Sequence, residues 1–175
     1  HLQGGDDRHP GRHNVLCWPM VQGLHALATS RAGLVELFDR GLHELETLFE
    51  GTGGSFFEIY HAQSGAAEGG WQGGRQWESQ PDQTWSASAF LHLIHTGLLG
   101  LLTEPDGIRF APCVPERLAG VAVRGLPYRS STLDVVVSGH GTRLRSVHVD
   151  GCRVPVDGLH VPADVDGRHL VELVL

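Results

Sequence analysis

Residues 83–110, QTWSASAFLHLIHTGLLGLLTEPDGIRF, contain the point at which the chain changes from a helical to a strand-like pattern. The first part of this stretch predicts a helix over about residues 85–101 that is apolar on almost every side. A helix with so little polar surface needs cover on several sides, and the rest of the chain offers no obvious cover. At residues 104–107, EPDG, the helical pattern stops and short strand-like runs begin. The sequence therefore predicts an α+β chain with two domains, residues 1–104 and residues 105–175.

Two earlier helices are predicted by apolar residues that recur at spacings of three and four. The first runs from about residue 15 to residue 29, with Asn14 as its cap. Pro19 falls in its first turn, where a missing N–H has no helical partner. The second runs from about residue 31 to residue 50, and the glycine-rich sequence that follows stops it. Residues 51–83 are then predicted as a long loop, and a loop of this length inside a compact domain is commonly functional.

The last part of the chain consists of short strand-like runs separated by Asp-Gly pairs. Such pairs suit tight hairpins because their residues tolerate positive φ. Apolar and polar residues alternate over residues 132–137 and 143–149, which fits antiparallel strands with one buried face. We therefore predict a small antiparallel β-sandwich. Its expected strands are residues 108–110, 120–123, 132–138, 143–149, 159–161 and 169–175.

The composition is that of a globular protein and excludes two classes of partner. The chain has 175 residues, of which 41% are hydrophobic and 19% charged, and its net charge is −7. No apolar run approaches the ~20 residues that a membrane-spanning helix needs. The acidic first part lacks the clustered positive charge that nucleic acid requires. We therefore predict no membrane and no nucleic acid as partners.

Neither the cysteines nor the histidines predict a metal site. Cys17, Cys113 and Cys152 are too scattered for a disulfide framework or a structural zinc site. His92 and His95 lie three apart on an apolar helix but have no further ligand nearby. We predict no metal and no cofactor. Without a signal sequence or a disulfide framework a cytoplasmic location is favoured, and because the chain opens on His rather than Met we expect it to be a piece of a longer protein.

The predicted loop over residues 51–83 is rich in the groups that bind sugars. Planar amides, guanidinium groups and carboxylates can make paired hydrogen bonds to neighbouring hydroxyls. Tryptophan faces can cover the apolar face of a pyranose. The alternative is that Trp71 and Trp77 only anchor the loop by packing.

A series of short motifs runs through the chain in a fixed order. They are Arg12-His13-Asn14, Trp18-Pro19, Phe57-Glu58-Ile59-Tyr60-His61, Ser64-Gly65, Gly69-Gly70-Trp71-Gln72, Gln83-Thr84-Trp85-Ser86-Ala87, Phe110-Ala111-Pro112 and Pro115. Their order and spacing resemble the six-hairpin glycoside hydrolases, the group that includes trehalases, processing α-glucosidases and mannosylglycerate hydrolases. The resemblance implies that residues 1–104 are the last helical hairpins of an (α/α)6 toroid and that residues 105–175 are the β-sandwich that many of these enzymes carry. It also implies a carbohydrate substrate and, as a partner, the remainder of the barrel in the same or a separate chain.

The resemblance implies that Glu58 is the general base of an inverting glycosidase. An inverting site uses one carboxylate to deprotonate water and a second, protonated carboxyl group to assist the leaving oxygen, roughly 6.5–9.5 Å away. Aromatic neighbours of Glu58 would partly shield it from water. The second group is not found: Asp6, Asp7, Glu78 and Asp82 are carboxylates near the proposed site, but none lies in a matching motif. We therefore expect this chain to hold the base, to lack the acid and to show little activity alone.

The remaining candidates are residues that would line the sugar site. They are Arg12, His13, Asn14, Trp18, Tyr60, Trp71, Gln72, Trp77, Gln83, Trp85 and Ser86. Ser86 has an alternative role as a helix-start cap. Two other functions stay open: a non-catalytic carbohydrate-binding or interaction module, which would not need Glu58, and a glycoside phosphorylase of similar barrel. A phosphorylase needs a phosphate site, and the glycine run at residues 69–74 lacks the lysine of a phosphate loop.

Overall fold

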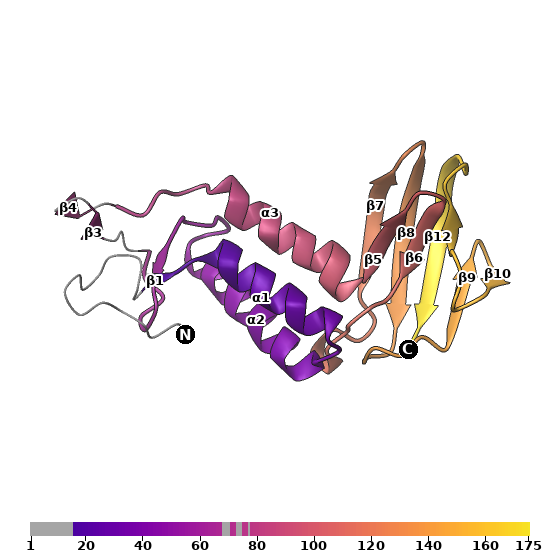
Figure 1. Ribbon diagram of the computed structural model, residues 1–175, viewed down its shortest axis with the longest axis horizontal. Helices are drawn as coiled ribbons and strands as arrows, with labels where there is room; N and C mark the ends of the chain where they lie inside the picture. Colours follow the sequence, from indigo (N-terminus) through magenta and orange to yellow (C-terminus); the bar gives the residue numbers. More distant parts are fainter. Residues whose placement is uncertain (1–15, 68–70, 73–74, 77) are drawn as a thin grey trace. The chain divides into compact units, whose positions relative to one another are not determined.

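The computed structural model describes residues 16–67, 71–72, 75–76 and 78–175 (Figure 1). These residues form two compact units. The first comprises the described residues up to Ala26 together with Arg40–Leu93, and the second comprises Leu27–Asp39 and Ile94–Leu175. In the described part of the chain, no helix has the length and apolar character needed to cross a membrane.

Among the described residues there are three α-helices, as the sequence predicts, with shifted ends. They are α1, Pro19–Arg31, α2, Val35–Gly51, and α3, Thr84–His92. Pro19 is the first residue of α1, the position where its missing N–H has no helical acceptor to lose. The helix begins later than expected because the preceding residues form strand β1, Leu16–Cys17, which pairs with β2, Tyr60–His61.

The end of α1 shows why α2 begins four residues later than the periodicity suggests. Gly33 adopts φ +70°, and its N–H donates to the carbonyl of Ser30 at 3.0 Å. The N–H of Leu34 donates to the carbonyl of Thr29, also at 3.0 Å. This pair of bonds satisfies the last carbonyls of α1 and turns the chain before α2 can start.

The prediction of one long helix over residues 85–101 is wrong in its last part. After α3 the chain continues as a wide π-helical segment, Leu93–Leu98, and Leu101–Glu104 is a strand. This strand, β5, pairs with β6, Gly107–Phe110. Periodicity cannot separate the two states here, because a short apolar run fits a buried strand as well as a buried helix.

Small residues allow close approach of the helices within the first unit. A Cβ added at Gly41 of α2 would lie 2.8 Å from the Cβ of Ala26 in α1. A Cβ added at Gly23 of α1 would lie 3.1 Å from the Cβ of Ala89 in α3. These contacts bring α1 close to both α2 and α3.

The second unit is built on two sheets and is sandwich-like, as expected. The three-stranded sheet has the order β11-β6-β5, and the five-stranded sheet has the order β10-β9-β12-β8-β7. The remaining strands are β7, Ala122–Tyr128, β8, Ser131–Ser138, β9, Ser146–Val149, β10, Cys152–Val154, β11, Val161–Pro162, and β12, Gly167–Val174. In the first unit Trp71–Gln72 and Arg75–Gln76 form a short pair, β3 and β4.

The predicted alternation of the strands is confirmed, but one pairing differs from the prediction. In β8, Leu133, Val135 and Val137 are fully buried and alternate with partly exposed residues. The sheet is not wholly antiparallel, because β12 runs parallel to β8 and antiparallel to β9. The parallel pair arises because β12, the last strand in sequence, lies between β8 and β9. Strands β5 and β10 were not predicted.

Two of the Asp-Gly pairs form hairpins as expected. Val149 pairs with Cys152 across a turn in which Asp150 has φ +51° and Gly151 has φ +77°. Two consecutive residues with positive φ make the turn type whose twist suits a two-residue hairpin. The β5–β6 hairpin has a different turn: Glu104 pairs with Gly107, so Pro105 and Asp106 are the turn residues and Gly107 is the first residue of β6.

A buried histidine links β6 of the three-stranded sheet to the segment before β11. His160 is 2% exposed; its Nδ1 accepts the Phe110 N–H at 3.1 Å, and its Nε2 lies 3.1 Å from the Val156 carbonyl oxygen. Because Nδ1 accepts, the hydrogen is on Nε2 and the ring is neutral. Burial lowers the pKa of His160 below its ordinary value of 6.5.

The free energy of unfolding is therefore expected to fall when the pH drops from about 7.5 to about 5.5. In this range His160 becomes protonated in the unfolded state but stays neutral in the folded state. His169 acts in the opposite direction, because its hydrogen bond with Asp150 raises its pKa. Its contribution is present at low pH and is lost as the pH rises through that pKa. Denaturant unfolding of His160→Gln should accordingly show a weaker loss of stability in acid than the parent chain. Equal slopes for the parent chain and His160→Gln would contradict the assignment.

Candidate functional site

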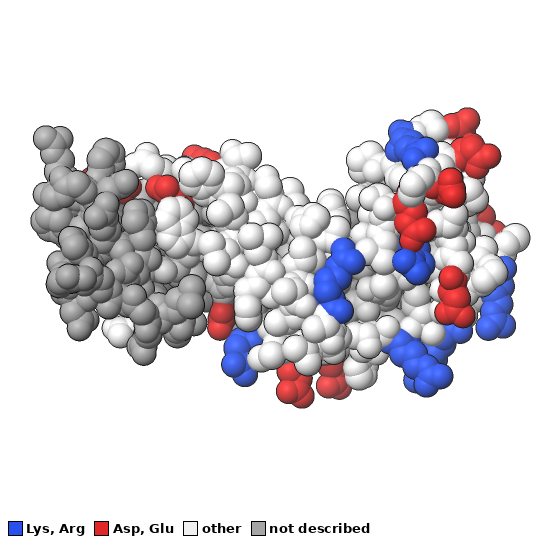
Figure 2. All heavy atoms as spheres, in the orientation of Figure 1, with Lys and Arg blue, Asp and Glu red and all other residues white. Residues whose placement is uncertain are grey.

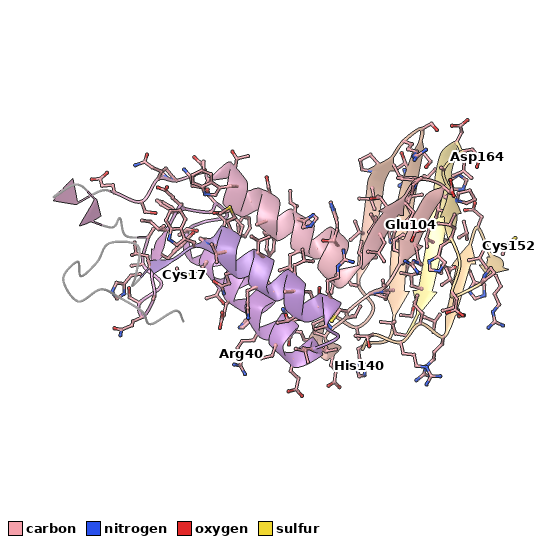
Figure 3. All side chains as sticks on the ribbon, viewed as in Figure 1. Cys17, Arg40, Glu104, His140, Cys152 and Asp164 are labelled. Atoms are coloured by element: carbon pink, nitrogen blue, oxygen red, sulfur yellow. The ribbon has the colours of Figure 1, made fainter. Side chains whose placement is uncertain are left out.

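The segment around Glu58 is held in place by main-chain hydrogen bonds to the segment that leads into α3. The Glu58 N–H donates to the carbonyl of Gln80 at 2.8 Å, and the Gln83 N–H donates to the carbonyl of Phe56 at 2.8 Å. On the other side, Tyr60 pairs with Cys17, which lies where β1 leads into α1 (Figure 3). Glu58 is thereby placed between residues that precede the first turns of α1 and α3.

A serine that sequence analysis missed secures the same segment. The hydroxyl of Ser79 accepts the N–H of Ile59 at 3.0 Å and donates to the carbonyl of Ile59 at 2.6 Å. Ser79 is 7% exposed and Ile59 is buried, so these two hydrogen bonds take the place of water at the main-chain N–H and carbonyl of Ile59. Nothing in the sequence distinguishes Ser79 from the other serines of the loop, because its role depends on a residue twenty positions away.

Buried aromatic rings pack on the interior side of the Glu58 segment. Phe56 is 3% exposed and packs against Phe49 of α2 and Phe90 of α3, with ring centroids 5.2 and 5.5 Å apart. Tyr60 is fully buried, and its hydroxyl accepts the N–H of Phe57 at 2.8 Å. Tyr60 is therefore a core residue next to the Glu58 segment, and its contact with a sugar stays a prediction.

The Glu58 side chain itself is half-buried. Among the side chains that the structure describes, none forms an ion pair or a hydrogen bond with its carboxylate. The backbone is thus fixed on both sides of Glu58, while its carboxylate is left available to a water molecule or a substrate hydroxyl.

The other described candidates lie at the starts of α1 and α3. Trp18, directly before α1, is half-buried, and Trp85, the second residue of α3, is 46% exposed. Gln83 is the residue that caps α3, without a side-chain hydrogen bond to the helix. Ser86 is the third residue of the helix and is 1% exposed, so the alternative that it caps the helix is wrong. Its hydroxyl has no hydrogen-bond partner among the described residues.

Several predicted site residues fall outside what the structure describes. Arg12, His13, Asn14 and Trp77 lie outside the described residues, as do the carboxylates Asp6 and Asp7. For Trp71 and Gln72 only the backbone is described, as strand β3. Their proposed contacts with sugar stay predictions.

The described carboxylates near Glu58 do not supply a clear second catalytic group. Asp82 accepts the hydroxyl hydrogen of Ser55 at 2.6 Å and has φ +54°, so it stabilises the turn before α3. Glu78 is exposed. No group of three or more histidine, cysteine or acidic side chains within the described ranges is placed to hold a metal ion.

A protein-family model matches part of the chain. Residues 102–161, about a third of the chain, match the family model described as glycosyl hydrolase family 65, C-terminal domain. The matched region runs from β5 to the start of β11, within the sandwich-like second unit. No relative is found among the curated proteins at a significant level of similarity. The match indicates that the chain is part of a glycoside-acting enzyme, either a hydrolase or a phosphorylase.

Proposed function

We propose that this chain is the C-terminal part of an inverting glycoside hydrolase in which Glu58 is the general base. The observation that supports it most directly is the half-buried Glu58 carboxylate, with no partner among the described side chains, on a backbone fixed by hydrogen bonds to residues 79, 80 and 83. A general base must be free to accept a proton and must be held in a constant position relative to the sugar. The hydrogen-bonded backbone of Glu58 and its carboxylate, unpaired within the described part of the chain, support this role.

The chemistry needs a single carboxylate on this side of the sugar. Glu58 takes a proton from water as the oxygen of that water forms a bond to the anomeric carbon. The glycosidic bond to the leaving oxygen breaks on the opposite face, where a second carboxyl group donates its proton. Exposed Trp85 lies at the start of α3 and offers a flat face to the apolar side of a pyranose.

The second carboxyl group is proposed to come from the remainder of an (α/α)6 barrel, in the same or a separate chain. In support, the helices expose large apolar side chains, among them Val21 and Leu24 of α1, at 51% and 57%, and Leu91 of α3, at 56%. On the face in view, charged side chains are sparse over the described helices and frequent over the strands (Figure 2). Further barrel helices would cover these apolar residues.

A glycoside phosphorylase is the second candidate, because the family match is compatible with either reaction. In a phosphorylase the nucleophile is phosphate, which is already anionic, so a base that deprotonates water is not needed. Hydrolysis therefore needs Glu58 as a base and phosphorolysis does not, and the two reactions give different products. A hydrolase releases a free sugar, whereas a phosphorylase releases a sugar 1-phosphate.

We expect the enzyme that contains this chain to hydrolyse a neutral glycoside without phosphate and to release a sugar of inverted anomeric configuration. Proton NMR of the first product formed from a panel of α- and β-glycosides measures the configuration directly. The same assay with and without inorganic phosphate serves as the control. Turnover that depends on phosphate would instead establish phosphorolysis, and retained configuration would exclude the proposed role of Glu58.

A further inference from the structure

The connection between β8 and β9 crosses the end of another strand. Because β12 lies between β8 and β9 in the sheet, residues 139–145 must pass over the last residues of β12. Main-chain bonds fix this arch: Gly141 exchanges two hydrogen bonds with Val114, at 2.7 and 2.9 Å, and the Arg145 N–H donates to Val174 at 2.8 Å. The N–H of Leu175 donates to the carbonyl of Ser138, also at 2.8 Å. The arch is therefore a built feature of the second unit.

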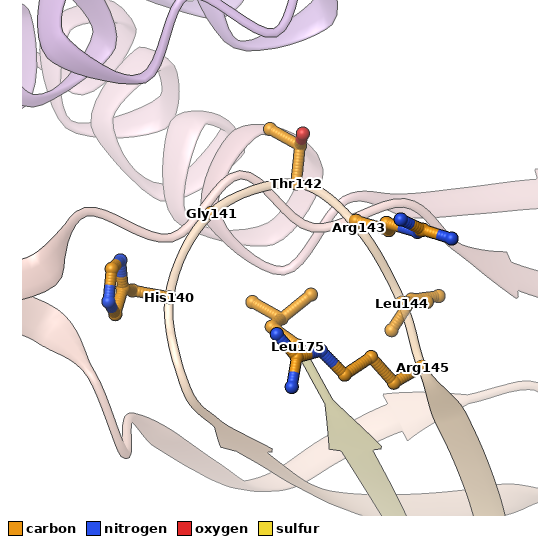
Figure 4. Close-up of a pocket in the computed structure, with 7 residues that line it drawn as sticks. All are labelled: His140, Gly141, Thr142, Arg143, Leu144, Arg145 and Leu175. Carbon is orange, nitrogen blue, oxygen red and sulfur yellow. The ribbon is translucent and has the colours of Figure 1, made fainter.

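The arch borders an open hollow of about 560 Å³ next to Leu175 (Figure 4). The residues that line it are His140, Gly141, Thr142, Arg143, Leu144, Arg145 and Leu175. In the view of Figure 4 the Arg145 side chain lies across the ring, while Arg143 and His140 extend from the rim; all three side chains belong to exposed residues. No acidic side chain lines the hollow, and none occurs between Asp134 and Asp150 in a protein of net charge −7.

The donors of the arch are not used within the described structure. Neither Arg143 nor Arg145 forms an ion pair with any described carboxylate. In contrast, Arg109, Arg117 and Arg168 of the same unit are each paired with an acidic side chain. Within the described ranges no acceptor is recorded for the main-chain N–H of His140, Thr142 or Leu144.

We infer that this arch binds a phosphate group. An arginine fork matches the oxygens of a phosphate group with two parallel hydrogen bonds, and main-chain N–H groups in an irregular loop complement the same oxygens. Arg145 provides the direct contact, and Arg143 and His140 add positive potential at the rim. The phosphate group can be free phosphate or part of a phosphorylated sugar. The proposed phosphate site lies in the second unit, and it does not depend on the role of Glu58 in the first unit.

The test is titration of the nitrogen-15-labelled full chain with inorganic phosphate and, separately, with glucose 6-phosphate. Amide signals of residues 139–145 are expected to shift in a saturable way with at least one of the two probes. A shift with glucose 6-phosphate alone identifies a phosphorylated sugar as the ligand, and equal shifts with both identify the phosphate group as sufficient.

Charge-removing variants separate this site from general attraction to a positive surface. Arg145→Ala is expected to weaken binding about tenfold or more, since a charge-assisted hydrogen bond contributes roughly 1.5–3 kcal/mol. Arg143→Ala should weaken it less. Arg153→Ala, an exposed arginine on β10 outside the hollow, is the matched control and should leave binding unchanged. Absence of shifts in the arch with both probes, or equal weakening by Arg145→Ala and Arg153→Ala, would overturn the inference.

Discussion

Glu58→Gln in the enzyme that contains this chain is expected to lower kcat for hydrolysis by about 10²–10⁴-fold. Glutamine has almost the same shape as glutamate but cannot take a proton from water. The bonds that fix the segment are made by its main chain and by Ser79, so the fold and the sugar-binding surface should persist. Steady-state kinetics should therefore show a large fall in kcat with little change in KM.

Glu78→Gln is the matched control, because it removes an exposed carboxylate from the same loop and should leave kcat close to the parent value. Sugar binding by the Glu58→Gln variant, measured by calorimetry, distinguishes lost chemistry from lost structure. Unchanged hydrolysis by Glu58→Gln would refute the assignment and would favour a non-catalytic carbohydrate-binding role for this segment.

Gly100→Ala is expected to destabilise the second unit by about 4 kcal/mol or more, which is a large share of the roughly 5–15 kcal/mol by which an ordinary domain is stable. Gly100 adopts φ +63°, which L side chains rarely adopt. A Cβ at this position would lie 1.8 Å from the carbonyl oxygen of Ala111 and 2.5 Å from the nitrogen of Pro112. Neither is the end of a flexible side chain, so the backbone itself would have to move. The movement would break the 2.8 Å hydrogen bond from the Ala111 N–H to the Gly100 carbonyl.

Gly151→Ala provides the comparison, because Gly151 also has positive φ, +77°, but a Cβ there meets nothing within 4 Å. This variant should lose only about 1 kcal/mol, the ordinary cost of a side chain in the left-handed region. Urea unfolding followed by circular dichroism measures both. If the two variants lost similar amounts of unfolding free energy, the backbone around Gly100 could accommodate a Cβ easily and the prediction would be wrong.

The elements that local pattern determines were predicted well. The alternation around Val135 identifies β8 because one face of the strand is buried. Pro19 only limits the start of α1 to nearby residues, since proline fits the first turn of a helix, and the predicted start near residue 15 is too early. The end of α3 was not predictable in this way. Residues 93–101 are apolar whether they form helix or strand, and the choice depends on pairing of Leu101 with Phe110 and on the close approach at Gly100.

In the candidate site, too, features set by nearby residues were predictable, whereas features set by contacts between residues distant in sequence were not. The order of the motifs draws attention to Glu58, and the structure places it on a fixed and partly exposed segment. Burial of Tyr60 and the bridging hydroxyl of Ser79 were not predictable, because each depends on residues that come together only in the folded unit. The parallel pairing of β12 with β8 depends on contacts between strands distant in sequence.

The placement of β12 between β8 and β9 determines when the sheet can be completed during synthesis. The β7–β8 and β9–β10 hairpins each consist of neighbouring residues and can form as soon as they leave the ribosome. They cannot join one another until residues 167–174 have emerged, because no other strand connects them. Until then the nascent polypeptide presents two open strand edges, β8 and β9, to any chaperone or neighbouring chain nearby.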